Sequence, residues 1–385
     1  MTTRDGESRG GSGRGIGRRR LLTLAAGGAA GLALTAGGAG RANWTALAQT
    51  AVADPEADPE ADPVADPTAG ASPASGDTLT IYAGQHASTV EAIAAAFTKA
   101  TGIPVQIRSG EDAELANQLV AEGASSPADV VITENSPALM LLSEQKLLAP
   151  VDAATLARVP ERYNSPNDDW VGTAARETVL VYNPALLPAE NLPQSVLDLA
   201  KPEWQGKIGI APAESDFQPL VAAVAKLEGR DAAAAWLDGL ARNAETYQGN
   251  FAILRAVEAG DLAAGIINHY YWFRLAKEVG ADQMHSKLYY FRRHDPGALV
   301  NVSGAGVLAA GRHPDEAQRF LAFLVSDAGQ AALVASGDFE YPLAKGDAAA
   351  PGLEPFDKLE PPAISIADLG DGREAVELLQ DAGLL

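Results

Sequence analysis

Two adjacent tyrosines, Tyr270 and Tyr271, stand at a predicted junction between a strand and a helix. The apolar run from Leu262 to Ile267 predicts a short buried strand, and Trp272 to Val279 predicts a helix. The free N–H groups and partial positive charge at a helix N-terminus favour anions, including phenolate. Neighbouring side chains on a regular strand point to opposite faces, whereas at such a junction both can reach one ligand. The pair therefore predicts a ligand site, with simple burial in the core as the alternative.

Two further polar side chains are predicted at the same kind of position. His86 follows a strand at Leu79 to Tyr82, and Glu134 follows a strand at Asp129 to Thr133. Strands and helices alternate from Thr78 onward, which predicts a parallel, doubly wound α/β sheet with right-handed crossovers. Ligands bind beyond the carboxyl ends of the strands in such sheets. Taken alone, His86 could be a solvated histidine in a loop and Glu134 the start of a helix. Their shared position at strand ends favours a ligand site.

A histidine, a carboxylate and two phenols form an oxygen-rich ligand set without sulfur. Such a set suits a hard, highly charged cation that can hold tyrosine as phenolate, although the pKa of a free phenol is about 10. Ferric iron meets this description. Zinc more usually takes histidine, cysteine and carboxylate, and calcium or magnesium takes carboxylates and carbonyls without imidazole. Octahedral iron leaves two positions for an anion or water, which Asn250, Asn268 and the N–H groups of the tyrosine helix are placed to hold.

The remaining elements predict a chain that crosses between two domains. The β-rich run Thr178 to Pro184 predicts the crossing into a second domain, and Leu299 to Leu308 predicts the return strand. Gly304 and Gly306 in the return strand indicate close approach of the backbone. We therefore expect one lobe formed by residues 78–174 plus 301–352 and another formed by residues 175–300 plus 353–385.

The N-terminal region predicts an exported protein. A basic stretch ending in Arg-Arg-Arg-Leu-Leu at residues 18–22 matches the twin-arginine pattern, and Ala-Leu-Ala at 46–48 offers a cleavage site. We expect a signal peptide at 1–48 and an extended Ala-Asp-Pro-rich, disordered spacer at 49–77, with an uncleaved membrane anchor as the alternative. The sequence contains no cysteine, which excludes a lipidated cysteine, disulfides and thiolate metal sites. A net charge of −21 over 385 residues argues against nucleic acid or anionic lipid as a partner.

Five motifs, in this order along the chain, resemble those of the ferric-ion-binding proteins of bacterial ABC importers, periplasmic members of extracellular solute-binding family 1. The similarity runs from about Thr78 to the C-terminus and excludes the signal and spacer. It implies a type II periplasmic-binding-protein fold, with two lobes joined by two crossover hinge strands. The motifs are Gly84-Gln85-His86, Pro127-Ala128-Asp129-Val130 with Thr133-Glu134, Ile267-Asn268-His269-Tyr270-Tyr271-Trp272, Asp295-Pro296-Gly297-Ala298-Leu299-Val300 and Glu340-Tyr341-Pro342-Leu343.

The resemblance also implies roles for individual residues. It makes His86, Glu134, Tyr270 and Tyr271 the iron ligands, and Asn250 and Asn268 anion-binding residues. Arg176 would be the cleft arginine near the tyrosines. Ser215 lies in the loop that corresponds to the anion loop of relatives, and Asn135 stands where some relatives carry glutamine. The loop reads Glu214-Ser215-Asp216, whose carboxylates would repel phosphate, so the accompanying anion (carbonate, phosphate or citrate) stays open.

We therefore expect a monomeric, non-enzymatic protein that captures Fe(III) in the cleft between its lobes and delivers it to an ABC permease. It would act in the periplasm or on the outer face of the cytoplasmic membrane, and the uncleaved signal is one means of attachment. One alternative keeps the fold and binds an organic solute such as a polyamine, thiamine or a sulfonate. Another is an iron-dependent extracellular enzyme with His269 as a second histidine ligand.

Overall fold

The computed structural model describes residues 78–345 and 349–385. The predicted signal peptide at 1–48 and spacer at 49–77 lie outside this part of the chain. Across the described residues, no helix is both long enough and apolar enough to cross a membrane.

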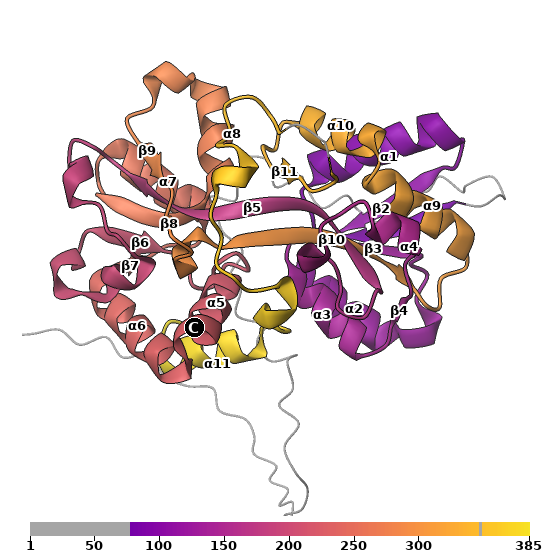
Figure 1. The fold of residues 1–385 in the computed structure, drawn as a ribbon, viewed down its shortest axis with the longest axis horizontal. Helices are drawn as coiled ribbons and strands as arrows, with labels where there is room; N and C mark the ends of the chain where they lie inside the picture. Colours follow the sequence, from indigo (N-terminus) through magenta and orange to yellow (C-terminus); the bar gives the residue numbers. More distant parts are fainter. Residues whose placement is uncertain (1–77, 346–348) are drawn as a thin grey trace, which may run out of the picture. The chain divides into compact units, whose positions relative to one another are not determined.

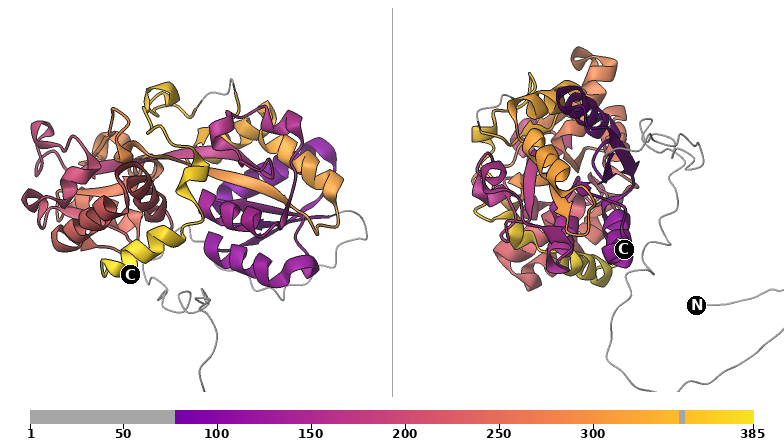
Figure 2. Two further views of the ribbon diagram at one scale, coloured as in Figure 1. Left: turned by 60° about the horizontal axis from the view of Figure 1, so that its bottom comes forward. Right: turned by 90° about the vertical axis from the view of Figure 1, so that its right-hand side faces the viewer.

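Two strands, β5 (Trp170–Tyr182) and β10 (Val300–Leu308), run side by side between two groups of elements (Figure 1). The two strands are antiparallel to each other. The N-terminal part of β5 pairs with β10 and β11, whereas its C-terminal part pairs with β8 and β9. Since β10 also pairs with β3, these two strands connect the groups as the predicted crossover strands. The left view of Figure 2 shows the two groups and the strands between them from a second direction.

The first group is built on the predicted parallel sheet, in which β1 pairs with both β2 and β3. Helices lie on both faces of this sheet, with α1, α9 and α10 on one and α2 and α3 on the other (Figure 1). In α1 the apolar residues Val90, Ile93 and Phe97 are buried, as expected for an amphipathic helix. The elements are β1 (Leu79–Ala83), α1 (Ala87–Thr101), β2 (Val105–Ser109), α2 (Asp112–Glu122), β3 (Val130–Thr133), α3 (Ser136–Glu144), β4 (Leu148–Ala149), α4 (Ala153–Leu156), α9 (Pro314–Leu324), α10 (Asp327–Ser336) and β11 (Tyr341–Pro342).

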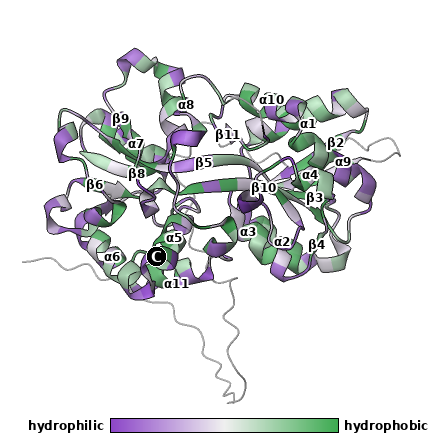
Figure 3. Ribbon diagram, in the orientation of Figure 1, coloured by the Kyte–Doolittle hydropathy of each residue, from purple (hydrophilic) through white to green (hydrophobic). Residues whose placement is uncertain are grey.

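The second group repeats the parallel arrangement, with β6 pairing to both β7 and β8. The last helix, α11, packs against α5 and α6 of this group. Its helices interleave apolar and polar residues, as those of the first group do (Figure 3). The elements are β6 (Ile208–Ile210), α5 (Phe217–Glu228), α6 (Arg230–Asn243), β7 (Ala244–Thr246), α7 (Asn250–Ala259), β8 (Ala264–Asn268), α8 (His269–Val279), β9 (Lys287–Tyr289) and α11 (Arg373–Asp381).

The strands follow one hydrogen-bonded path in the order β2-β1-β3-β10-β5-β8-β6-β7. The fold is therefore the predicted two-lobed α/β fold, with parallel pairing inside each lobe and antiparallel pairing at the crossover strands. The sequence pattern predicted β5 only from residue 178 onward, yet the strand begins at Trp170. All of its residues are buried, so no alternation of exposed and buried positions marks its first half. The lobe boundaries after residues 174, 300 and 352 stay a proposal.

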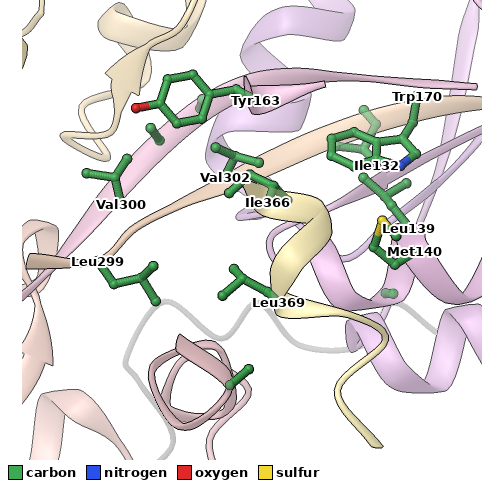
Figure 4. Packing of buried hydrophobic residues seen from close by; sticks show 14 of the residues in the cluster. Ile132, Leu139, Met140, Tyr163, Trp170, Leu299, Val300, Val302, Ile366 and Leu369 are labelled. Carbon is green, nitrogen blue, oxygen red and sulfur yellow. The ribbon is translucent and has the colours of Figure 1, made fainter. Parts of the chain in front are cut away.

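The hydrophobic core continues through the crossing strands (Figure 4). At one end, Trp170 of β5 lies near Leu139 and Met140 of α3. Close to it, a Cβ added at Gly304 would lie 2.7 Å from Cδ1 of Leu139 and 3.0 Å from the carbonyl oxygen of Val171. The predicted close approach at Gly304 is thus confirmed: only glycine leaves room for the neighbouring side chain and strand.

Candidate metal-binding site

The two tyrosines lie in the first turn of α8, directly after β8. Asn268 occupies the N-cap position of α8, but its side chain does not cap the helix. The rings of Tyr270 and Tyr271 stack with their centroids 4.3 Å apart and an interplanar angle of 30°. Tyr270 is fully buried and Tyr271 is partly buried. The strand-to-helix junction therefore makes the two phenols converge, as predicted.

Asp216 joins the two phenols. Its Oδ2 lies 3.2 Å from the hydroxyl of Tyr270 and 3.4 Å from that of Tyr271. It stands at the N-cap position of α5, after β6, which pairs in parallel with β8. Because parallel strands end at the same edge, this carboxylate and the tyrosines meet. From the sequence, Asp216 was expected only to repel anions; its place at the start of a helix shortly after an apolar strand was the available signal.

Glu134 and His86 reach the tyrosines from the first lobe. Oε1 of Glu134, directly after β3, lies 2.9 Å from the hydroxyl of Tyr270. The His86 ring, at the start of α1, meets the ring of Tyr270 edge-on with centroids 5.1 Å apart. The four predicted ligands therefore gather in one place. No group of three or more His, Cys, Asp or Glu side chains that could hold a metal occurs among the described residues.

Arg176 on β5 is fully buried at the centre of this site. Its Nε lies 3.5 Å from Oδ1 of Asp216 and 4.0 Å from Oε1 of Glu134, and its Nη1 lies 3.7 Å from Oε1 of Glu340. These carboxylates raise the pKa of the guanidinium against the opposing effect of burial, so it stays charged. The prediction of an arginine beside the tyrosines fits this placement. The contact between Arg176 and Glu340 was not predicted from the sequence.

The remaining residues predicted to bind an anion surround Asp216 and Arg176. Nδ2 of Asn250 donates to Oδ2 of Asp216 at 3.3 Å, and the Asn268 side chain is also hydrogen-bonded to Asp216. Asn135 accepts a hydrogen bond from Nη2 of Arg176 and donates to Oγ of Ser215 at 3.1 Å. Two amides expected to hold an external anion are therefore engaged with a carboxylate of the chain itself.

Burial and like charge determine how these groups ionise. Burial, and next the charge of Asp216, raise the pKa of both phenols well above 10. Burial, and next the charge of Glu134, raise the pKa of Asp216. Burial alone would also raise the pKa of Glu134, but His86, Arg176 and the hydrogen bond from Tyr270 outweigh it and lower that pKa. The site thus holds an ionised glutamate beside two protonated phenols.

His269 is not available as a second histidine ligand. Its Nδ1 accepts a hydrogen bond from the backbone N–H of Glu177 at 3.1 Å, and its Nε2 lies 2.9 Å from the carbonyl oxygen of Phe339. Burial lowers the pKa of His269 to about 4, so the ring is neutral near neutral pH. Both ring nitrogens are engaged by the backbone, which gives this histidine a structural role.

Glu177, the next residue along β5, is a buried carboxylate whose two oxygens have no hydrogen-bond partner among the described residues. Burial raises its pKa well above 4.5, although Arg292 acts in the opposite direction. The folded protein therefore holds a proton that the unfolded chain releases near pH 4, and this group lowers stability as pH rises through its folded pKa.

We expect Glu177→Gln to remove this pH-dependent loss of stability. Between about pH 5 and pH 8 the thermal midpoint of the wild type should fall further than that of the variant. Only in the wild type does the folded state keep a proton, on Glu177, that the unfolded chain has released over this pH range. The difference in free energy of unfolding should exceed about 1.4 kcal/mol, which corresponds to one pKa unit. Calorimetry on both proteins measures it, with Glu190→Gln at an exposed position as control. Parallel pH profiles would show that Glu177 is not perturbed.

The fold and this polar site define a two-lobed solute-binding protein. A sequence profile described as bacterial extracellular solute-binding protein matches residues 125–361. The chain is 46% identical over 317 residues to the Fe(3+)-binding periplasmic protein of Serratia marcescens, which covers 82% of this chain and 94% of that relative. This chain belongs to the bacterial extracellular solute-binding protein family.

Two solved structures resemble this one closely. Iron-bound HitA from Pseudomonas aeruginosa is 47% identical, with a TM-score of 0.77, and the match covers 80% of this chain and 100% of that one. The Trichodesmium protein IdiA (FutA), in complex with iron and citrate, is 29% identical, with a TM-score of 0.72 over 80% of this chain and 100% of that one.

Proposed function

We propose that this protein captures ferric iron outside the cytoplasmic membrane and delivers it to an ABC permease. The observation that carries the proposal is the convergence of His86, Glu134, Tyr270 and Tyr271 from two lobes, with Tyr270 and Glu134 in contact at 2.9 Å. The names of the Serratia relative and of iron-bound HitA support it. The proposed role requires export, for which the twin-arginine sequence is the proposed route, and a monomer suffices for it. It needs no catalytic step.

Capture replaces protons with iron. The Tyr270 hydroxyl donates to a carboxylate, either Glu134 or Asp216. Fe(III) would take the place of the phenol protons, with Glu134 and a ring nitrogen of His86 completing the contacts from the first lobe. Because ligands come from both lobes, one bound ion would hold the lobes together. Arg176 stays charged beneath the site and offsets the negative charge that the phenolates add.

We also propose that Asp216 supplies the ligand that an external anion would otherwise provide. Its Oδ2 already lies against both phenols, and the amides of Asn250 and Asn268 are bound to it. Two phenolates, Glu134 and Asp216 together carry four negative charges, which Fe(III) and the Arg176 guanidinium neutralise. A carbonate, phosphate or citrate added beside Asp216 would meet a like charge in a buried place.

We therefore expect iron to remain bound after gel filtration into buffer that contains no carbonate, phosphate or citrate. Asp216→Ala should lose at least about tenfold in affinity and regain it when one of these anions is added, because a site is then free for it. Iron and anion content per protein, measured after desalting, decide this. Asp261→Ala, at an exposed position in the same lobe, serves as control. Stoichiometric anion in the wild type would contradict the assignment of Asp216.

The function itself is tested by adding ferric citrate to the purified protein and recording the visible spectrum. Coordination by tyrosinate should give a charge-transfer band that stops growing at about one iron per protein. A protein that stays colourless at saturating iron would contradict the proposal. An organic solute such as a polyamine or thiamine in the same cleft would then be the next candidate to test.

A further inference from the structure

The residue before His86 contacts the histidine through a single atom. Oε1 of Gln85 lies 2.6 Å from the backbone nitrogen of His86 and 2.5 Å from Nδ1 of its ring. A backbone N–H can only donate, so the glutamine atom that faces it is the carbonyl oxygen. The same oxygen can only accept from the ring, and Nδ1 of His86 therefore carries the hydrogen.

The other end of the Gln85 amide independently requires the same orientation. Its Nε2 donates to Oγ of Ser303 at 2.6 Å and to Oε2 of Glu340 at 2.9 Å. Ser303 and Glu340 are themselves held beside Arg176, since Nη1 of the guanidinium lies 3.1 Å from Oγ of Ser303 and 3.7 Å from Oε1 of Glu340. Gln85, Ser303 and Glu340 are all buried. A flipped amide would leave its oxygen facing the Glu340 carboxylate and its NH2 group facing an N–H.

We propose that Gln85 is a positioning residue that holds His86 in the Nδ1–H tautomer and so leaves Nε2 as the metal-binding nitrogen. A neutral imidazole carries hydrogen on one nitrogen only, and the hydrogen bond at one nitrogen determines which one remains free for a metal. In the opposite tautomer Nε2 would carry a hydrogen and could not coordinate. Metal-binding histidines are commonly oriented through their second nitrogen in this way. The metal-binding part of this inference rests on the proposed function, whereas the tautomer itself does not.

His269 provides an internal reference with the opposite tautomer. Its Nδ1 faces the backbone N–H of Glu177, a donor, and its Nε2 faces the carbonyl oxygen of Phe339, an acceptor. The hydrogen of His269 is therefore on Nε2. Two histidines in one molecule are thus expected to give opposite signatures in a single measurement.

The test is a long-range 1H–15N correlation spectrum of the iron-free protein labelled at its histidines, recorded above the pH at which free imidazole titrates. Substitution of His86 and of His269 assigns their signals. We expect an unprotonated Nε2 for His86 and an unprotonated Nδ1 for His269. A protonated Nε2 at His86 would overturn the proposal, and this result needs no variant of Gln85.

Variants of Gln85 test whether this residue sets the tautomer. Gln85→Met removes the acceptor at similar size, so His86 should lose its single tautomer and iron affinity should fall roughly 10- to 100-fold. Gln85→Glu combined with Glu340→Gln keeps an oxygen toward Nδ1 without setting two carboxylates against each other, and should keep the tautomer. Gln330→Met is the matched control, because Gln330 is a buried glutamine of the same lobe that bonds only backbone groups of Thr173, Leu324 and Ala344. An unchanged His86 signal in Gln85→Met, or an equal loss of iron in Gln330→Met, would overturn the proposal.

Failure of the proposed function would look different. Suppose that the wild-type protein binds no ferric iron, but that His86 shows an unprotonated Nε2 that depends on Gln85. The proposal of iron capture would then be wrong, and the assignment of Gln85 as the residue that sets the tautomer would stand. If iron bound tightly but His86 carried its hydrogen on Nε2, the reverse would hold.

Discussion

Replacing either Tyr270 or Tyr271 with phenylalanine should reduce the affinity for ferric iron by well over about 100-fold. Losing a residue that only hydrogen-bonds to a metal ligand typically costs roughly 10- to 100-fold, and here a ligand itself is lost. Each change removes one phenolate from a trivalent ion and nothing else of the side chain. Tyr270 should show the larger effect, because its hydroxyl also contacts Glu134 at 2.9 Å and so connects the two lobes, whereas Tyr271 contacts Asp216 at 3.4 Å.

Competition with a chelator of known affinity measures the loss, and the visible charge-transfer band reports the ligand directly. The band should weaken or shift in each single variant and disappear in the double variant. Tyr247→Phe is the matched control, since this tyrosine belongs to the same lobe and its hydroxyl donates to Glu245 at 3.3 Å. A double variant that binds iron as tightly as the wild type would exclude both phenols as ligands.

Iron affinity should fall about 100-fold for each unit by which the pH is lowered, because two protons must leave for each iron bound. Burial, followed by the Asp216 charge, raises the pKa of both phenols well above 10, so both are protonated without iron throughout the neutral range. Iron binds only the deprotonated oxygens. Higher pH therefore strengthens binding and acid weakens it. The raised pKa of Asp216 adds to the proton count where that carboxyl is protonated.

The number of protons released for each iron bound can also be measured directly, without deriving it from competition with a chelator. An indicator dye in weak buffer should report about two protons per iron in excess of the blank, and Tyr271→Phe should reduce the number by about one. The double phenylalanine variant supplies the blank for hydrolysis of the added ferric complex. Release of less than one proton, or an affinity that stays constant between about pH 6 and pH 8, would show that at least one phenol does not coordinate.

Several local features of this site could be predicted because they follow from neighbouring residues. The tyrosine pair lies at a strand-to-helix junction, and His86 and Glu134 follow β1 and β3, as the hydrophobic patterns indicated. Apolar periodicity and helix-start residues determine such elements within a few turns of chain, and the carboxyl end of a strand is known once the strand is known.

The first half of β5 and the role of Asp216 could not be predicted in this way. Residues of β5 are buried whether apolar or charged, Arg176 and Glu177 among them, so periodicity carries no signal there. Asp216 reaches the tyrosines because β6 pairs in parallel with β8, and Glu134 reaches Tyr270 because the two lobes meet there.

The sequence by itself determined which residue types follow each strand, the two-lobed α/β class and the ligand set that indicates a hard trivalent ion. Only the tertiary structure decided which groups share protons and charge: Arg176 among three carboxylates, Asp216 against the two phenols, and Gln85 against His86. The physical reason is that local sequence patterns reflect backbone hydrogen bonding and the burial of side chains within a few turns of chain. Ionisation and hydrogen-bond direction depend instead on every charge and donor that the folded chain brings within a few ångströms.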